Sequence, residues 1–186
     1  MNLLFEAAKE VCEFMEKRKW RFCIIGGLAV QKWGEPRTTL DADITLLTGW
    51  GEEEPFVSAL LKRFEPRMED GYEFALTHRV ALIRASNGTD VDIALGALPF
   101  EEEMIQRSEK IEFAPGIELP CCTAEDLFIM KAFSGRSRDW VDAESIVTRQ
   151  KSLDKKYISS HLSELCDLKE SPQNFEKAKR LLEEKS

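Results

Sequence analysis

Two Asp-x-Asp pairs are the residues of this sequence best suited to carry chemistry. Asp41 and Asp43 open the apolar segment 41–47, and Asp90 and Asp92 open a second apolar segment at 90–95. Alternate residues of a β-strand point to the same face, so each pair places two carboxylates side by side. Ionised carboxylates repel each other at this distance, and a divalent cation removes the repulsion. Oxygen ligands of this kind suit Mg²⁺, with waters and substrate phosphates completing its coordination.

The two pairs can form one three-carboxylate cluster if their strands are neighbours in a sheet. Asp92 leads directly into an apolar run, as Asp43 does, whereas Asp90 follows the polar stretch 86–89 and can belong to a turn. We therefore favour Asp92 as the third carboxylate and keep Asp90 as the alternative. Either pair alone is also compatible with a solvated strand face.

Gly26 and Gly27 lie between the apolar segment 21–25 and a segment suited to a short helix, 28–33. A glycine turn at a helix N-terminus lets phosphate oxygens approach backbone N–H groups, where the helix dipole favours anions. Most Gly-Gly pairs are simple turns, so this pair gains its weight from its place ahead of the first Asp-x-Asp strand. The order of strand, glycines, helix, loop and carboxylate strand indicates a phosphate-binding site.

The elements that must position these residues follow from the hydrophobic pattern. Strands are predicted at 21–25, 41–47, 79–85 and 90–95, helices at 3–19, 28–33, 52–64 and 99–108, and a strand pair or irregular connection at 110–119. Asn87-Gly88 is a strong hairpin signal between two of the strands. From residue 123 on, only helices are predicted: one capped by Thr123 and ended by Gly135, one capped by Ser137, and two at 155–168 and 173–185.

This pattern predicts an α/β (α+β) fold in two parts. Residues 1–120 form a mixed sheet flanked by helices, including the N-terminal helix, and residues 121–186 form a C-terminal helical region packed on it. The formal net charge of −8 disfavours broad, sequence-independent wrapping of nucleic acid. The five cysteines include no C-x-x-C spacing and indicate neither a disulfide framework nor a zinc site. No apolar run approaches a membrane span or a signal core, so we expect a cytoplasmic protein without a membrane partner.

The stretches Gly26–Val30 and Arg37–Asp43 together resemble the signature of the DNA polymerase β-type nucleotidyltransferase superfamily. The sequence is most similar to the bacterial group that includes the AbiEii-type abortive-infection toxins. The similarity continues at 92–96, 99–101, 123–131 and 136–142, and thus covers about residues 22–148.

The resemblance implies the nucleotidyltransferase fold and a metal-dependent transfer of an NMP from an NTP to an acceptor hydroxyl. It implies Mg²⁺ or Mn²⁺ as the cofactor, with the catalytic and metal-binding residues Asp41, Asp43 and Asp92. The nucleotide-binding residues that it implies are Gly26, Gly27, Thr39, Lys131 and Arg136. The acceptor can be an RNA such as the 3′ end of tRNA, a protein or a small molecule, and a cognate antitoxin or other partner protein is implied by the toxin group.

Two positions depart from the superfamily pattern. Leu28 stands where a serine hydroxyl usually helps to hold the triphosphate, and Ala42 replaces a larger aliphatic residue. Leu28 favours an alternative function, a catalytically inactive binding module or toxin–antitoxin partner with the same fold. The presence of all three metal carboxylates favours the enzyme.

Several charged residues have both a functional and a structural interpretation. Lys131 can contact nucleotide phosphates or be a solvated side chain. Arg37 can touch substrate or pair with Glu35. Asp139 and Asp142 share a helix face and can pair with the neighbouring arginines.

Overall fold

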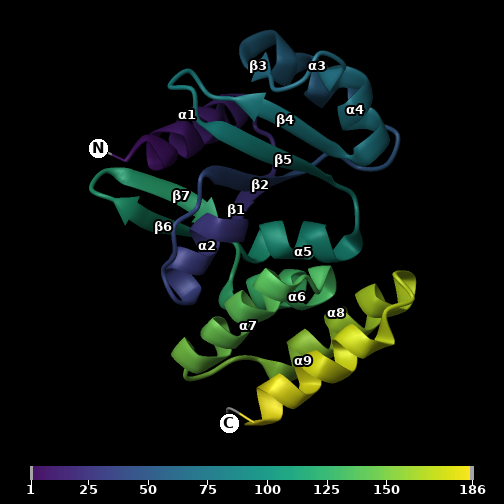
Figure 1. Ribbon diagram of the computed structural model, residues 1–186. Helices are drawn as coiled ribbons and strands as arrows, with labels where there is room; N and C mark the ends of the chain where they lie inside the picture. Colours follow the sequence, from purple (N-terminus) through teal and green to yellow (C-terminus); the bar gives the residue numbers. More distant parts are fainter. Residues whose placement is uncertain (1, 185–186) are drawn as a thin grey trace. The chain divides into compact units, whose positions relative to one another are not determined.

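Within residues 2–184, which the computed structural model describes, a seven-stranded mixed sheet has the strand order β3-β4-β5-β2-β1-β7-β6 (Figure 1). The strands are β1 (Phe22–Ile25), β2 (Asp41–Leu47), β3 (Glu65–Pro66), β4 (Val80–Arg84), β5 (Asp90–Gly96), β6 (Glu109–Ala114) and β7 (Ile117–Cys121). β2 runs parallel to β5, and β1 runs parallel to β7, whereas the other pairs are antiparallel. The predicted mixed sheet flanked by helices is confirmed.

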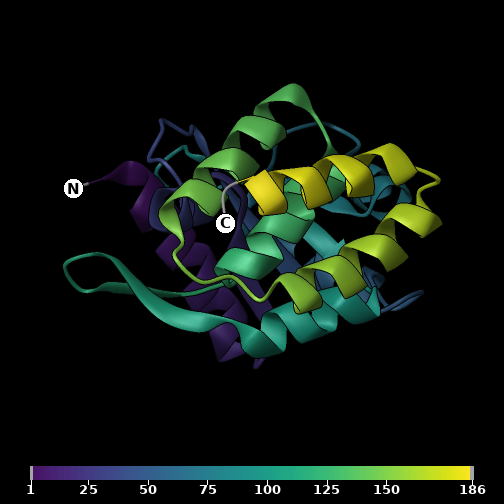
Figure 2. The same cartoon turned by 90° about the horizontal axis from the view of Figure 1, so that it is seen from below.

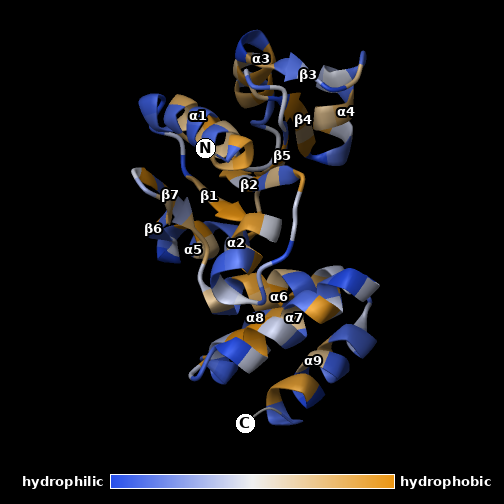
Figure 3. Ribbon diagram, turned by 60° about the vertical axis from the view of Figure 1, so that its left-hand side comes forward, coloured by the Kyte–Doolittle hydropathy of each residue, from blue (hydrophilic) through white to orange (hydrophobic). Residues whose placement is uncertain are grey.

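The strand β2 illustrates why this segment folds as the sequence pattern predicts. Ala42, Ile44 and Leu46 are fully buried, and they alternate with the less buried Asp41 and Asp43. A strand with this alternation buries one face and leaves its carboxylates on the other. In Figure 3 the neighbouring β1 is coloured as hydrophobic along its length, and all four of its residues are buried. The core of the sheet therefore lies under β1 and β2.

The helices of the described chain before residue 123 are α1 (Leu3–Lys17), α2 (Gly26–Trp33), α3 (Glu54–Arg63), α4 (Gly71–His78) and α5 (Pro99–Arg107). α1 packs across β7, β2 and β5 through its apolar side, which buries Ala7, Val11 and Met15. Its N-terminus is capped by the Asn2 side chain, which accepts a hydrogen bond from the backbone of Leu4. α1 thus covers one face of the central strands.

In the described residues from Thr123 on, four helices follow one another: α6 (Ala124–Ser134), α7 (Ser137–Arg149), α8 (Lys155–Leu168) and α9 (Pro172–Glu184). Thr123 caps α6 by accepting a hydrogen bond from the backbone of Asp126, and Gly135 ends it in the left-handed conformation, as predicted. α8 and α9 are joined by a three-residue turn and lie side by side in opposite directions (Figures 1 and 2). Both contact α6, which is the central helix of this group.

By its internal contacts the chain divides into two units. The α/β unit contains the described residues up to Leu28 together with Thr38–Cys122, and the helical unit contains Ala29–Arg37 together with the described residues from Thr123 on. The helical unit is therefore built from two separate stretches of sequence. None of the helices in the described part of the chain is both long enough and apolar enough to cross a membrane.

Some elements differ from the sequence pattern. α2 begins at Gly26 rather than at residue 28, and the segment 110–119 lies in the hairpin of β6 and β7. Arg136, not Ser137, stands at the N-cap of α7 and makes no side-chain cap bond. The pattern does not predict β3 or α4, because β3 has two residues and α4 buries only two, so neither has a clear periodicity.

Candidate functional site

The adjacent parallel strands β2 and β5 bring both Asp-x-Asp pairs together. Asp41 lies opposite Asp90, and Asp43 lies opposite Asp92. The intervening Ala42 is fully buried, so the pairs project from the other face of the sheet. Four carboxylates therefore share one face, and Asp90 belongs to the strand rather than to the preceding turn.

Asp41 and Asp43 are each held by a hydrogen bond from a residue that the sequence motif contains. The Thr39 hydroxyl donates to Asp41 Oδ1 at 3.0 Å, and the Gly27 backbone N–H donates to Asp43 Oδ2 at 3.2 Å. Gly26 has a positive φ of 60°, and a side chain there would overlap the Asp43 carboxylate. The glycines thus let the chain pass directly beside Asp43, a role that phosphate-binding reasoning alone did not reveal.

Gly27→Ala should lower stability and disturb the Asp41 carboxylate. A Cβ at this position would lie 2.5 Å from Thr39 Oγ1 and 2.7 Å from Thr39 Cβ, so Thr39 must move. Overpacking of this kind costs about 1–3 kcal/mol. Thermal unfolding of Gly27→Ala should therefore begin at a lower temperature than that of the wild type. Equal melting temperatures would show that Thr39 yields without cost.

Arg67 is a charged partner of the second pair that sequence reasoning missed. Its Nη1 lies 3.0 Å from Asp90 Oδ2, and its Nη2 lies 2.6 Å from Asp92 Oδ1. Arg84 also pairs with Asp90, at 3.2 Å. Arg67 belongs to no motif, and it reaches Asp92, 25 residues away, only because β3, β4 and β5 are consecutive in the sheet.

The two carboxylates of the second pair differ in their electrostatic environment. Burial alone would raise the pKa of Asp90, but hydrogen bonds from Arg67 and Arg84 bring it below the usual value. Burial raises the pKa of Asp92, and repulsion by Asp41 and Asp90 adds to this, although Arg67 opposes it. Within the second pair, Asp92 is therefore the carboxylate whose charge is less compensated.

These carboxylates suit a divalent cation in donor type and in the face that they share. Asp41 is close enough to Asp92 to disfavour its ionisation, which is the repulsion that a cation would relieve. In the conformation described for residues 2–184, however, no three Asp, Glu, His or Cys side chains are already gathered as a metal site. The Asp92 carboxylate is instead engaged by Arg67.

The helical unit contains a second group of charged residues. Lys131 Nζ lies 2.9 Å from Asp139 Oδ1 and 2.8 Å from Asp142 Oδ2, and all three residues are buried. Arg37 forms two hydrogen bonds with Asp142, at 2.7 and 2.9 Å. Arg136 Nε contacts Asp139 at 2.6 Å, as the sequence analysis allowed. Lys131 is therefore not the solvated side chain of the structural interpretation.

The partner of Arg37 differs from the one that the sequence suggested. Asp142 binds Arg37 in a two-pronged ion pair, and Glu35 forms its ion pair with Arg149 at 3.0 Å. The pairing of Arg37 with Asp142 spans 105 residues. No local spacing indicates such a contact, so only the fold reveals it.

Acid should destabilise the protein through Asp139 and Asp142. Burial alone would raise the pKa of both, but hydrogen bonds from Arg136 and Lys131 lower that of Asp139, and hydrogen bonds from Arg37 and Lys131 lower that of Asp142. A lowered folded-state pKa contributes stability that is present above the unfolded value and is lost as the pH falls through the folded value. The loss should therefore occur below the ordinary Asp value of 3.8.

Urea unfolding between about pH 7 and pH 2 measures this dependence. Asp142→Asn should be less stable than the wild type at neutral pH and should lose less stability toward acid. An identical acid slope in both proteins would contradict the contribution of Asp142.

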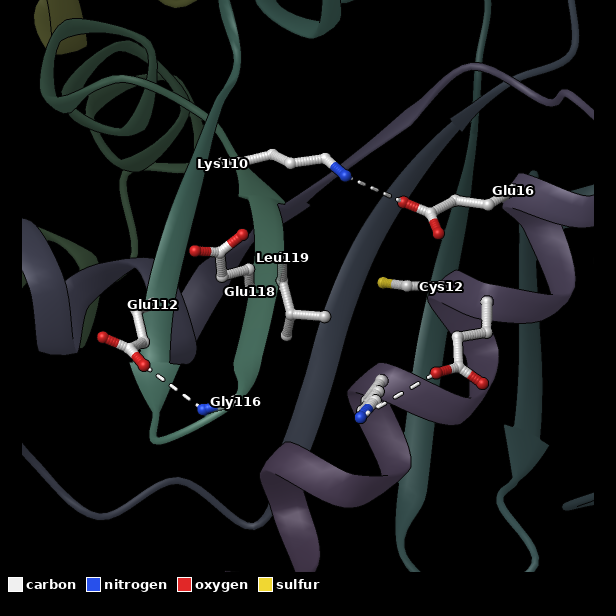
Figure 4. Close-up of a pocket in the computed structure, with 9 residues that line it drawn as sticks. Cys12, Glu16, Lys110, Glu112, Gly116, Glu118 and Leu119 are labelled. Carbon is white, nitrogen blue, oxygen red and sulfur yellow. Dashed lines mark hydrogen bonds and ion pairs between the residues drawn. The ribbon is translucent and has the colours of Figure 1, made fainter.

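A hollow of about 350 Å³ in the α/β unit lies between α1 and the β6–β7 hairpin (Figure 4). Lys110 faces Glu16 across it at 3.8 Å, and Glu112 accepts a hydrogen bond from the Gly116 backbone at 3.2 Å. None of the site residues predicted from the sequence is among the residues that line it. The candidate site therefore remains the carboxylate face of β2 and β5.

A comparison with solved structures identifies the class of fold to which this chain belongs. An antigenic nucleotidyltransferase-like protein from Paracoccidioides brasiliensis matches with a TM-score of 0.56 and 16% identity, over 94% of this chain and 92% of that chain. The antibiotic-resistance factor ANT(2'')-Ia matches with a TM-score of 0.54 and 15% identity, over 93% of this chain and 96% of that one. The fold is that of the nucleotidyltransferases.

A family-level comparison then narrows the class. The sequence model described as nucleotidyl transferase AbiEii toxin, type IV TA system, matches residues 17–184. The chain belongs to this AbiEii family of nucleotidyltransferase toxins, which confirms the resemblance found in the sequence. A comparison with curated proteins finds no match.

Proposed function

We propose that the chain is a Mg²⁺- or Mn²⁺-dependent nucleotidyltransferase that moves an NMP from an NTP to an acceptor hydroxyl and releases pyrophosphate. The observation that carries the proposal is the common face of Asp41, Asp43 and Asp92 on two adjacent parallel strands. Membership of the family supports the class of reaction. The three carboxylates are the proposed catalytic and metal-binding residues.

Each of these side chains has a definite task in the proposed reaction. A bound divalent cation would neutralise triphosphate oxygens and lower the pKa of the acceptor hydroxyl. Asp43 is oriented for this by the Gly27 N–H, and Asp41 is oriented by the Thr39 hydroxyl. Neighbours that fix the direction of a metal-binding group raise its effectiveness. Gly27 and Thr39 thus support the ligands, in addition to the nucleotide contacts proposed for them.

The proposed nucleotide contacts extend to Gly26, Lys131 and Arg136. Arg136 has a side chain that is 79% exposed, which supports a contact with a dissolved nucleotide. Lys131 Nζ is engaged by two buried carboxylates, so its proposed contact with a phosphate requires one of these ion pairs to open. Cations at phosphate oxygens would offset the charge of the departing pyrophosphate.

The acceptor and the partner follow from the family only as classes. A toxin of a type IV system supports a cellular target such as an RNA 3′ end or a protein, and a cognate antitoxin as the partner. A small-molecule acceptor is the third class. The net charge of −8 argues for local recognition rather than for extended binding along nucleic acid.

A catalytically inactive binding module is the second candidate function. The position usually taken by a triphosphate-binding serine is Leu28, which is fully buried and belongs to the core. The leucine side chain, unlike a serine hydroxyl, cannot donate a hydrogen bond to a phosphate. The two functions differ in whether any nucleotide is transferred.

The test is incubation with each radiolabelled NTP, with Mg²⁺ or Mn²⁺, and with total RNA and lysate protein as acceptors. Label from one NTP should move to one class of acceptor with the wild type and not with Asp41→Asn. Asp41→Asn is a suitable control because the amide keeps an oxygen that can accept from Thr39. Absence of transfer under all conditions would favour the binding module.

A further inference from the structure

Arg67 places a positive charge between the two carboxylates of the second pair. It donates to Asp90 Oδ2 and Asp92 Oδ1 at 3.0 and 2.6 Å, and its side chain is only 19% exposed. Its backbone N–H bonds to Leu82 O at 3.0 Å, which ties this residue to β4. The guanidinium is therefore a fixed part of the carboxylate face.

One donor of the Arg67 guanidinium is used by neither carboxylate of the second pair. Its Nε atom is buried and has no hydrogen-bond partner. An unpaired buried donor is unfavourable, by roughly 1–3 kcal/mol in typical proteins. The guanidinium thus engages both carboxylates through its Nη atoms, while its Nε stays buried.

The charges on this face are unevenly distributed. Arg67 and Arg84 both pair with Asp90, whereas Arg67 is the arginine that reaches Asp92. Asp41 accepts from the Thr39 hydroxyl, which carries no charge. A cation that approaches Asp41 and Asp92 must therefore compete with Arg67 for an Asp92 oxygen and overcome its positive charge.

We propose that Arg67 is a positioning residue that holds Asp92 until a divalent cation replaces it, and so sets the cation concentration at which the site fills. The inference rests on the proposed function, because it assumes that Asp92 is a metal ligand. Arg67 retains Asp90 through its other nitrogen when Asp92 changes partner. Only one of its two ion pairs is exchanged, and the guanidinium stays at the edge of the site.

The test is Mn²⁺ binding without nucleotide, measured by the electron paramagnetic resonance signal of free Mn²⁺. Arg67→Gln removes the charge and should tighten Mn²⁺ binding on the order of tenfold, from the repulsion between a divalent ion and a unit charge a few ångströms apart. Arg67→Lys retains the charge and should bind Mn²⁺ much as the wild type does. The matched control is Arg84→Gln, which removes an equal charge from Asp90 and Glu65. It should have a smaller effect.

A second measurement uses the wild type alone and therefore does not depend on the folding of a variant. The Nε–H signal of Arg67 in an NMR spectrum should shift during a Mg²⁺ titration and saturate together with metal binding. A shift that follows binding supports the exchange of partners, and an unmoved Arg67 signal in a protein that binds Mg²⁺ overturns it.

The outcomes separate this inference from the proposed function. If the wild type binds Mn²⁺ and Arg67→Gln binds it no more tightly, the inference is wrong and the metal site stands. If the wild type fails to bind and Arg67→Gln binds, Arg67 is confirmed as the competitor. If neither protein binds Mn²⁺, the proposed metal site is wrong, and so is the inference that rests on it.

Discussion

Asp43→Asn should reduce nucleotide transfer by on the order of 10³-fold, since it removes a charged ligand from a site whose cation supplies several kcal/mol of transition-state stabilisation. The substitution should leave the fold intact. Asparagine keeps an oxygen that can accept the Gly27 N–H hydrogen bond, and it removes one negative charge from a face that carries four carboxylates. Without metal, its melting temperature should equal or slightly exceed that of the wild type.

Two controls make this prediction specific. Asp43→Ala loses the acceptor as well as the charge, so it should show the same loss of transfer together with a lower melting temperature. Asp90→Asn changes a carboxylate that two arginines already compensate, and it should keep far more activity. Normal transfer by Asp43→Asn would show that Asp43 is not a catalytic residue. A large drop in the melting temperature of this variant would show that Asp43 is needed for the fold.

Lys131→Ala should destabilise the protein by about 3 kcal/mol, in the range expected when one partner of a buried ion pair is removed. Lys131 contacts Asp139 and Asp142, whose side chains are 4% and 2% exposed. Arg136 and Arg37 still pair with these carboxylates in the variant, which limits the loss. From the sequence alone, we expect this substitution to leave stability nearly unchanged, and the buried ion pairs correct that expectation.

Urea unfolding at neutral pH measures the effect. Lys169→Ala is the matched control, because Lys169 is a lysine of the same unit whose contacts with Phe133 O and Ser134 O are exposed. It should lose much less stability. If Lys131→Ala unfolds like the wild type, the ion pairs of Lys131 with Asp139 and Asp142 do not stabilise the packing of α6 and α7. A loss of activity in that variant would then indicate a role in phosphate binding.

The fold was largely predictable where local patterns decide it. β2 begins and ends at the residues that its alternation predicts, Asp41 and Leu47, and α6 has the predicted cap at each end. These features depend on periodicity and on the chemistry of single residues. α4 and β3 are short and show no such pattern, so they were not predictable.

The candidate site also contains residues that the sequence predicts and residues that it does not. The sharing of one face by Asp41, Asp43 and Asp92 follows from strand periodicity once the strands are neighbours, and the structure has them adjacent. Arg67 could not be found, because its pairing depends on the order of three strands. Arg37 and Asp142 likewise meet across a long stretch of sequence. Long-range ion pairs leave no local signal, and the sequence reveals them only through the fold.

The split composition of the helical unit has a consequence for the order of events at the ribosome. The segment Ala29–Arg37 is made early, yet Arg37 pairs with Asp142 after 105 further residues, and Trp33 accepts from Gln150 after 117. At about 5–20 residues per second, the segment waits roughly 5–20 seconds for Asp142 to be made. The strands β2 to β7 are synthesised within this interval. A nascent chain stalled before residue 142 would thus contain all seven strands of the described sheet. Asp142 and Gln150, the partners of Arg37 and Trp33, would not yet have been made.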